Sequence, residues 1–364
     1  MKTFIPAGPV PGIRDVLRMT LATAAGRHPW ADIETFFYPS GRLALRDAVR
    51  KTPAQRGGVK RVWLPGYFCA EAAGPLRRDR LDLHFYPVGK DLCPDWDWLR
   101  RAAKRSRPDI LVVVHYFGFP AALDEAKRFS DGFGAAIIED AAHVLMPGAG
   151  VGEGNMTVYS PRKLLALPGG GLLTIPGRAS TGRAALRPPV FSGWAIKSIV
   201  KSAMFRAGIG WKGAAPCNGP KGVELDAESP SEKYEWAIKA MSDGAQGVMK
   251  RRRANFEYLS SGLRDFRGRG ITFKGLDEGV CPYAFPILAQ KRDLLLTRLH
   301  ASGIPARSWP DLPAEVLRDR GVHSGAHWLR GRLVLLPVHQ SLDEGHMNHI
   351  ARSFKKAMRD GGGQ

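Results

Sequence analysis

The chain has 364 residues, of which 54 are Lys or Arg and 34 are Asp or Glu, so its formal net charge is +20. With 44% hydrophobic residues it has globular proportions, which excludes a disordered chain, and its length allows one large and one smaller domain. The charge is compatible with nucleic acid, an anionic membrane surface or a small acidic substrate, and composition alone does not choose among them.

Cysteine spacing and apolar patterning indicate the cellular setting. The four cysteines are far apart and form no CxxC pair, which argues against a zinc ribbon and a disulfide framework; they are Cys69, Cys93, Cys217 and Cys281. No apolar run approaches the roughly 20 residues of a membrane span. Met1–Pro11 lacks the apolar stretch of a secretory signal. We therefore expect a cytoplasmic protein with free thiols and no bound metal.

Short apolar runs predict buried strands in the first half of the chain, at Arg61–Leu64, Leu81–Tyr86, Ile110–Val114 and Ala135–Ile138. Between them, Asp95–Arg105 and Ala122–Ser130 have helical spacing. Strands that alternate with helices predict an α/β domain with a mainly parallel sheet. Such sheets bind ligands at the carboxyl ends of their strands, so the residues that follow each run are the first site candidates.

A basic segment follows. From Gly154 to Val223 there are ten Lys or Arg and no Asp or Glu. Within it, residues 191–211 predict an amphipathic helix with Lys197, Lys201 and Arg206 on its polar side. Three interpretations stay open: contact with an anionic membrane surface, steering of an anionic substrate, and a lid or dimer-contact helix with solvated charges. No basic motif interleaved with aromatic residues supports nucleic-acid binding.

The last third of the chain predicts a second, smaller α+β domain. A long helix is expected over Ser231–Leu263, including the basic run Lys250–Arg253. Shorter strands and helices follow, at Gly270–Phe273, Tyr283–Leu288, Lys291–Ala301, Leu333–Leu336 and Glu344–Met358. We therefore divide the chain into a large domain, 1–243, with a basic insertion at about 178–222, and a small domain, 244–364.

Two residues carry the strongest chemical signal. Asp140 stands at the end of a predicted strand, with His143 three residues later, and Lys163 precedes a Gly-rich segment. A lysine in such a turn can form a Schiff base, and an aspartate at a strand end can pair with a pyridinium nitrogen. Taken singly, a solvated lysine and a helix-capping aspartate are the commoner situations. Spacing alone leaves both interpretations open.

The order of several segments resembles the DegT/DnrJ/StrS family of pyridoxal-phosphate (PLP) sugar aminotransferases. The segments are Ser40–Leu45 (SGRLAL), Val62–Phe68 (VWLPGYF), His115–Pro120 (HYFGFP), Ile138–His143 (IEDAAH), Ser160–Gly171 and Leu335–His339 (LLPVH). The resemblance implies an aspartate-aminotransferase-like PLP-dependent transferase fold of type I, an α/β fold with a mainly parallel large domain and a small C-terminal α+β domain.

The resemblance also implies roles for individual residues. Lys163 would form the Schiff base and move the proton, Asp140 would pair with the ring nitrogen, and His143 would contact the ring. Tyr67 or Phe68 would stack on the ring, and the sequence does not decide which. The phosphate would be held by Gly41, Arg42 and Ser160. The substrate entrance would be lined by Arg307, Trp309 and His339, the last of which is equally compatible with a structural role. His115 is expected to make a structural hydrogen bond.

The sequence departs from the family pattern at three places. Val158 stands where the family has a phosphate-binding Ser, and Arg42 replaces the usual Thr. The GYNxR motif, which reaches the partner subunit's active site, is replaced by Leu225–Ser229. The third departure weakens the inference of a nucleotide-linked sugar, whereas the inference of PLP does not depend on it.

The resemblance implies a homodimeric enzyme of sugar or polysaccharide biosynthesis. It would move an amino group from glutamate or glutamine to a keto-sugar, nucleotide-linked, by two-step transamination. One alternative is a PLP-dependent sugar dehydratase, but such relatives carry His at the lysine position, so Lys163 argues against it. The other is a cofactor-binding regulatory protein at a membrane surface, with peripheral contact through residues 191–211.

Overall fold

The computed structural model describes residues 4–21, 28–55, 58–148, 150–177, 192–210, 230–269, 276–309 and 311–359. Several predicted features lie outside these ranges: the strand Gly270–Phe273, the segment Leu225–Ser229, and the insertion at 178–222 apart from residues 192–210. Cys217 also lies outside them, and the other three cysteines are free thiols.

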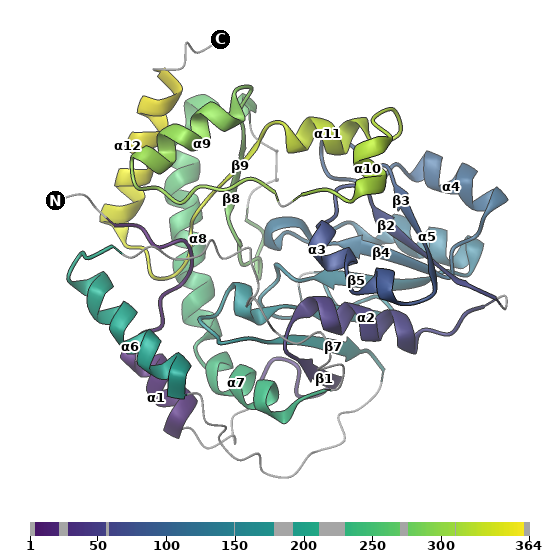
Figure 1. The fold of residues 1–364 in the computed structure, drawn as a ribbon, viewed down its shortest axis with the longest axis horizontal. Coiled ribbons are helices and arrows are strands. Elements are labelled where there is room, and N and C mark those ends of the chain that lie inside the picture. The colour runs from purple at the N-terminus through teal and green to yellow at the C-terminus, as the bar shows by residue number, and fades with distance from the viewer. Residues whose placement is uncertain are drawn as a thin grey trace.

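A seven-stranded sheet organises the larger part of the molecule, in the order β1-β7-β6-β5-β4-β2-β3 (Figure 1). Strands β2 to β6 pair in parallel, and only β7 runs antiparallel to its neighbours. All residues of β4 are buried, as expected for a central strand covered on both faces. The mainly parallel sheet and its four predicted strands are confirmed. The bounds are β1 Glu34–Tyr38, β2 Lys60–Pro65, β3 Leu81–Tyr86, β4 Ile110–Val114, β5 Ala136–Ala141, β6 Met156–Tyr159 and β7 Gly171–Ile175.

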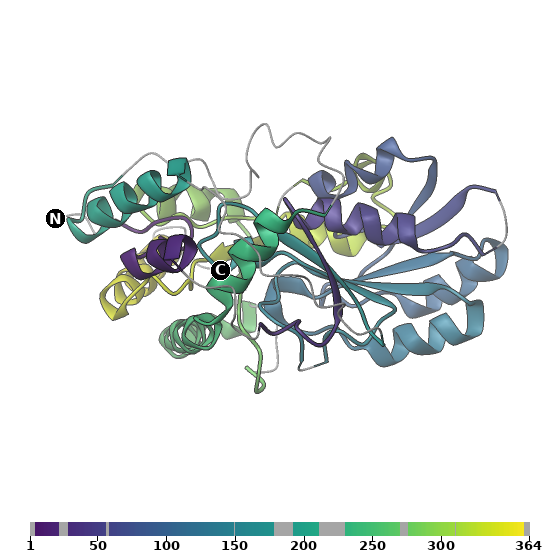
Figure 2. The ribbon, with the colours of Figure 1, turned by 90° about the horizontal axis from the view of Figure 1, so that it is seen from below.

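Helices cover both faces of this sheet, so three layers result (Figure 2). Helix α2 (Gly41–Lys51) packs on β1, β6 and β7, and α5 (Leu123–Phe133) packs on β4 and β5. Helix α4 (Trp96–Arg105) begins where the sequence predicts, because the Asp95 carboxylate accepts a hydrogen bond from the Trp98 amide, 2.9 Å. The remaining short elements here are α3 Ala70–Ala73, η1 Leu76–Arg78, η2 Tyr116–Gly118 and η3 Pro161–Lys163.

A second sheet of two antiparallel strands lies toward the C-terminus, formed by β8 (Phe285–Leu288) and β9 (Leu333–Leu336). Helix α12 packs against α8 and α9, and α9 packs on β9 (Figure 1). The α+β character predicted for this part is therefore present. The helices are α8 Ala245–Gly262, η4 Arg264–Arg269, α9 Arg292–Ala301, α10 Ala314–Arg318, α11 Ser324–Arg330 and α12 Glu344–Arg359.

The single long helix predicted over Ser231–Leu263 is wrong. The structure has two helices, α7 (Glu232–Ser242) and α8, separated at Asp243 and Gly244. They break because they pack on different partners: α7 contacts β1 and the N-terminal helix α1 (Ile13–Leu21), whereas α8 contacts α12. Apolar periodicity continues across the break, so it did not reveal the change of direction.

The helix predicted in the basic segment is present as α6 (Ser192–Arg206), which packs beside α1 (Figure 1). Its polarity differs from the prediction. The side turned into the molecule carries the buried Ser198 and Ser202, whereas Ile196 and Ile199 are exposed. None of the helices in the described ranges has the length and apolarity needed to span a membrane.

Candidate active site

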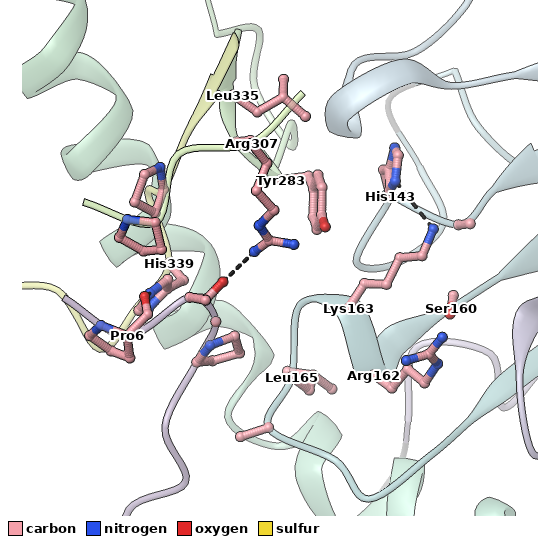
Figure 3. A pocket seen from close by; sticks show the side chains of 18 of the residues that line it. Pro6, His143, Ser160, Arg162, Lys163, Leu165, Tyr283, Arg307, Leu335 and His339 are labelled. Carbon is pink, nitrogen blue, oxygen red and sulfur yellow. Dashed lines mark hydrogen bonds between the residues drawn. The ribbon is translucent and has the colours of Figure 1, made fainter. Parts of the chain in front are cut away.

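A pocket of about 820 Å³ opens at the carboxyl ends of β4, β5 and β6, between the N-terminal segment 4–11, α6 and β9 (Figure 3). The fold thus brings residues from both ends of the chain to the edge of the sheet where the sequence predicts a site. The predicted site residues that line it are Gly41, Arg42, Phe68, Asp140, His143, Ser160, Lys163, Arg307, Trp309 and His339. Tyr67 is the one predicted site residue outside this wall.

One end of the pocket has the features of an anion cradle. Gly41 and Arg42 form the first turn of α2, where backbone amides and the helix dipole favour negative charge. The hydroxyls of Ser40 and Ser160 are buried there, and neither has a hydrogen-bond partner. The structure therefore adds Ser40 to the residues that could hold an anion. The sequence did not single it out for this role, although a serine directly before the first residue of a helix is a recognisable pattern.

Glycines allow the parts of this cradle to approach each other. A Cβ at Gly171, the first residue of β7, would lie 2.3 Å from the Gly41 nitrogen, so no side chain fits there. A Cβ at Gly41 would lie 3.1 Å from the Ser160 Cβ. The Gly-rich segment after Lys163 therefore holds the N-terminus of α2 directly against the turn that carries Ser160.

Asp140 lies on β5 in the floor of the pocket. One carboxylate oxygen accepts a hydrogen bond from the Ala142 amide, 3.0 Å. Burial raises the pKa of Asp140, and the charge of Lys163 and the Ala142 amide oppose that rise. A cation placed against this carboxylate would stabilise its charged form.

Lys163 and His143 meet at the centre of the pocket, with 3.2 Å between Nζ and Nε2 (Figure 3). Burial lowers the pKa of His143 far below its usual value, helped by the charges of Lys163 and Arg307, so the ring is neutral. Its Nδ1 accepts a hydrogen bond from the Phe117 amide, 3.3 Å, which leaves the single ring hydrogen on Nε2, facing Nζ. A lysine ammonium has no lone pair, so this Nε2 hydrogen can bond to Nζ, and His143 can orient the lysine, when Lys163 is a neutral amine.

The HYFGFP turn (His115–Pro120) and Tyr283 together fix the position of the His143 ring. The His143 ring stacks on Tyr283, with centroids 4.3 Å apart and planes inclined by 6°, and the Tyr283 amide donates to the Phe117 carbonyl, 2.8 Å. Gly118 makes this approach feasible, because its φ is +93° and a Cβ there would lie 2.3 Å from the Cys281 carbonyl oxygen. Tyr283 has no local sequence signal, since only the tertiary fold brings it to the site.

The structure separates the two aromatic candidates that the sequence left open. Phe68 lines the pocket. Tyr67 is fully buried and stacks on Trp309, with centroids 4.9 Å apart and planes inclined by 25°. Burial also raises the pKa of the Tyr67 hydroxyl well above its usual value. Phe68 is thus the ring at the pocket surface, and Tyr67 supports the wall through Trp309.

Arg307 and His339 hold the N-terminal segment across the pocket. The Arg307 guanidinium donates to the Ala7 carbonyl (Figure 3), and His339 Nε2 donates to the Pro6 carbonyl, 2.9 Å. Burial lowers the pKa of His339 to about 3, so its ring is neutral and its remaining hydrogen serves this bond. The Val10 amide donates to Ser341 Oγ, 2.9 Å. Segment 4–11 therefore forms part of the pocket wall, which the sequence did not predict.

The pocket wall is rich in cations. Acidic side chains in it are Glu71 and Asp140; basic ones are Arg42, Arg162, Lys163, Lys197, Lys201, Arg252 and Arg307. Arg252 is fully buried and donates to the Leu164 carbonyl, 3.2 Å, and to the Tyr283 carbonyl, 3.1 Å. It therefore clamps the lysine turn to the small sheet. The excess of positive charge favours an anionic ligand.

His115 has the structural role expected of it. Its Nε2 donates to Glu139, 2.7 Å, in a fully buried pair. Burial alone would raise the pKa of Glu139, but the hydrogen bonds from His115 and from the Gly152 and Gly154 amides outweigh it and lower that pKa. Because neighbouring strand residues face opposite sides, Glu139 points away from the side that Asp140 takes.

Residues 87–185, which include Asp140, His143 and Lys163, match the model of the DegT/DnrJ/EryC1/StrS aminotransferase family. Over this segment, the chain is therefore similar to an aminotransferase family. The resemblance drawn from the sequence motifs is thereby confirmed. No curated protein matches the sequence.

Solved structures share the fold over nearly the whole chain. A DegT/DnrJ/EryC1/StrS aminotransferase from Brucella abortus has a TM-score of 0.67 at 19% identity, covering 94% of this chain and 95% of its own. PseC of Helicobacter pylori, an aminotransferase involved in pseudoaminic acid biosynthesis, has a TM-score of 0.69 at 15% sequence identity. The match covers 99% of this chain and 100% of PseC. DesV of S. venezuelae, in complex with a ketimine intermediate, has a TM-score of 0.65 at 19% sequence identity. The match covers 96% of this chain and 90% of DesV. The expected type I transferase fold is confirmed.

Proposed function

We propose that this protein is a PLP-dependent aminotransferase that moves an amino group from glutamate or glutamine to a keto-sugar, nucleotide-linked. The observation that carries the proposal is the meeting, in one pocket, of a lysine amine, a buried carboxylate and an anion cradle with two unsatisfied hydroxyls. These are the three attachments that PLP requires: an amine for its aldehyde, an acid for its ring nitrogen and donors for its phosphate.

The residues present fit that cofactor. The phosphate would be held by the α2 amides with Ser40 and Ser160, whose buried hydroxyls would gain the partners they lack. Val158 is at the position where the family carries a phosphate-binding Ser. The Val158 side chain is apolar and buried, so it offers no hydrogen bond to a phosphate. We propose that Ser40 supplies the hydroxyl lost at that position.

The chain's own groups would perform the proton transfers. PLP, when bound, would supply an electron sink beside the carbon whose proton is moved. Asp140 would keep a proton on the ring nitrogen, and Lys163 Nζ would take and return the proton in both half-reactions. His143 would hold that amine in position through Nε2. Phe68 would cover one face of the ring.

The cationic wall supports an anionic substrate. Lys197 and Lys201 of α6 lie on the wall with Arg307, so a diphosphate group or an amino-acid carboxylate would meet positive charge. We further propose a homodimer and two units, residues 1–243 and 244–364. The break between α7 and α8 at Asp243 and Gly244 supports that division.

The visible absorption spectrum of the purified protein tests the proposal. We expect a band from bound PLP that is absent in Lys163→Ala and retained in Lys127→Ala, an exposed lysine paired with Glu153. Glutamate or glutamine should bleach the band, with release of the corresponding keto acid, whereas aspartate should not. A protein that stays colourless after PLP is added would refute the proposal. Bleaching by aspartate alone would refute the donor.

A further inference from the structure

The exposed apolar residues of the molecule are concentrated on two helices. Of the nine large hydrophobic residues classed as exposed in the described ranges, five belong to α1 and α6. On α6, Ile196 is 63% exposed, Ile199 49% and Val200 51%. On α1, Ile13 and Leu17 are each 48% exposed. We call these five residues the α1–α6 surface.

Helix geometry explains why this surface is continuous along α6. Positions 196, 199, 200 and 203 lie on one side of a helix with 3.6 residues per turn. The opposite side, with Ser198 and Ser202, is the one buried in the molecule. A helix in a globular protein normally turns its apolar side inward. Helix α6 has apolar residues inside as well, since Trp194 packs on the core and Phe205 contacts the His346 ring, but its outer side is also apolar and is available to something outside this chain.

Positive charge borders the apolar stripe. Lys197 and Lys201 lie along one edge of the stripe, Arg206 lies along the other, and all three are exposed. Arg14 is exposed on the neighbouring α1. No acidic residue occurs anywhere between Gly154 and Val223. An apolar stripe bordered by Lys and Arg is the pattern of helices that lie in the interface of an anionic bilayer.

Charge also distinguishes between a bilayer and a second copy of the chain. A two-fold interface pairs this patch with an identical one, so the cations Lys197, Lys201 and Arg206 would meet no acidic residue of a second α6. Acidic lipid headgroups instead complement these cations, on a protein whose net charge is already +20. We propose that the α1–α6 surface docks on an anionic membrane surface.

Docking would place the pocket beside the bilayer. The inner side of α6 lines the pocket through Trp194, Lys197, Ser198 and Lys201. A helix is about 10 Å in diameter, so a bilayer in contact with the outer side would lie about one helix away from the pocket wall. This inference does not depend on the reaction proposed above, because the apolar residues Ile196, Ile199 and Val200 that carry it do not line the pocket.

Co-sedimentation of the full chain with lipid vesicles tests the docking proposal. We expect binding to vesicles of phosphatidylcholine with phosphatidylglycerol, little binding to phosphatidylcholine alone, and weaker binding as NaCl is raised. Ile196→Gln combined with Ile199→Gln should weaken binding about tenfold or more, because two side chains no longer enter the lipid. The matched control is Val59→Gln with Val322→Gln, two exposed apolar residues elsewhere, which should leave binding unchanged.

Other results would overturn the docking proposal. It fails if the wild-type chain does not bind the anionic vesicles, or if both double variants bind as the wild type does. It also fails if the Ile196 and Ile199 variant halves the molecular mass in light scattering, since the surface would then lie between copies. The PLP absorption band of each variant reports separately on the pocket, so the two proposals can fail independently.

Discussion

Two serine hydroxyls at the N-terminus of α2 are the most specific chemical feature of the pocket. Ser40 and Ser160 are buried without hydrogen-bond partners, which costs about 1–3 kcal/mol for each group. The backbone of Ser40 is extended, and its side chain makes no capping bond to the helix, so helix stability does not account for the hydroxyl. A phosphate oxygen would satisfy both groups.

We predict that Ser40→Ala and Ser160→Ala each weaken PLP binding about tenfold, because each removes one hydrogen bond to a charged phosphate. Thermal stability without PLP should rise, by up to about 1–3 kcal/mol in each variant, because each substitution removes a buried hydroxyl that has no partner. Titration of the PLP-free protein followed by absorbance measures the affinity. Ser261→Ala, at an exposed serine of α8 that does not line the pocket, serves as the control. Unchanged affinity in both variants would remove these hydroxyls from the phosphate site.

A second residue-scale prediction concerns pH. Burial lowers the pKa of His339 to about 3 from 6.5, so the unfolded chain binds this proton more readily than the folded one. Stability from this group is complete above pH 6.5 and is lost as pH falls toward 3. Between pH 6.5 and pH 5, protonation of His339 in the unfolded chain should lower the free energy of unfolding by about 2 kcal/mol. His339→Gln, whose amide can still donate to Pro6, should lose less over that interval in urea denaturation. Parallel curves for the two proteins would contradict this assignment.

At the scale of elements, turns and clamps rather than the strands themselves determine the geometry of the site. The HYFGFP turn carries the amide that orients His143 and the carbonyl that receives Tyr283. From the other side, Arg252 of α8 ties the lysine turn to the residues preceding β8. The N-terminal segment closes the pocket through Arg307 and His339. Two elements distant in sequence therefore support the lysine turn, and the N-terminal segment closes the pocket beside it.

Gly118→Ala tests the turn. The new Cβ would lie 2.3 Å from the Cys281 carbonyl oxygen at a φ of +93°, so we expect a loss of about 2 kcal/mol or more in unfolding free energy. Tyr283 should move away from His143, and PLP binding should weaken with it. Gly132→Ala in α5 is the matched control, because no atom lies within 4 Å of its Cβ position and alanine favours a helix, which should stabilise by about 0.5–1 kcal/mol. Equal stabilities for the two variants would contradict the packing argument.

Across the whole molecule, positive charge has two separate places of action. One is the inner wall of the pocket, where Lys197, Lys201 and Arg307 face the proposed substrate. The other is the outer border of α6, where the exposed Lys197 and Lys201 lie along one edge of the apolar stripe and Arg206 lies along the other. Both surfaces add to the net charge of +20, and each faces a different proposed partner.

The cations on the inner wall of the pocket should also determine how nucleotides inhibit the enzyme. A nucleoside diphosphate should compete with a nucleotide-linked acceptor, and its inhibition constant should rise with NaCl because the attraction is electrostatic. Lys197→Ala should raise that constant about tenfold, the effect of one lost charge-assisted hydrogen bond. Lys104→Ala, an exposed lysine of α4, should have no effect and serves as the control. Equal inhibition constants for the two variants would argue against α6 in substrate recognition.

Much of this arrangement could be predicted from local pattern. The fully buried strand Ile110–Val114 has the predicted bounds, because a short run of β-branched and apolar residues strongly favours a buried central strand. Asp140 and Lys163 were identified through motifs whose residues lie on or beside neighbouring strands, and the ordering of the strands then brings them together. Local pattern failed where packing partners change, as at Asp243 and Gly244 between α7 and α8.

The sequence by itself determined the fold class, the resemblance to an aminotransferase family and the residues that meet at the edge of the sheet, because these depend on periodicity and on short motifs. Only the tertiary structure decided that Phe68 and not Tyr67 reaches the pocket, and that Tyr283 supports His143. It also decided that α6 turns its serines inward and its isoleucines outward. Hydropathy gives the two sides of a helix, but what each side faces depends on contacts between segments far apart in the chain.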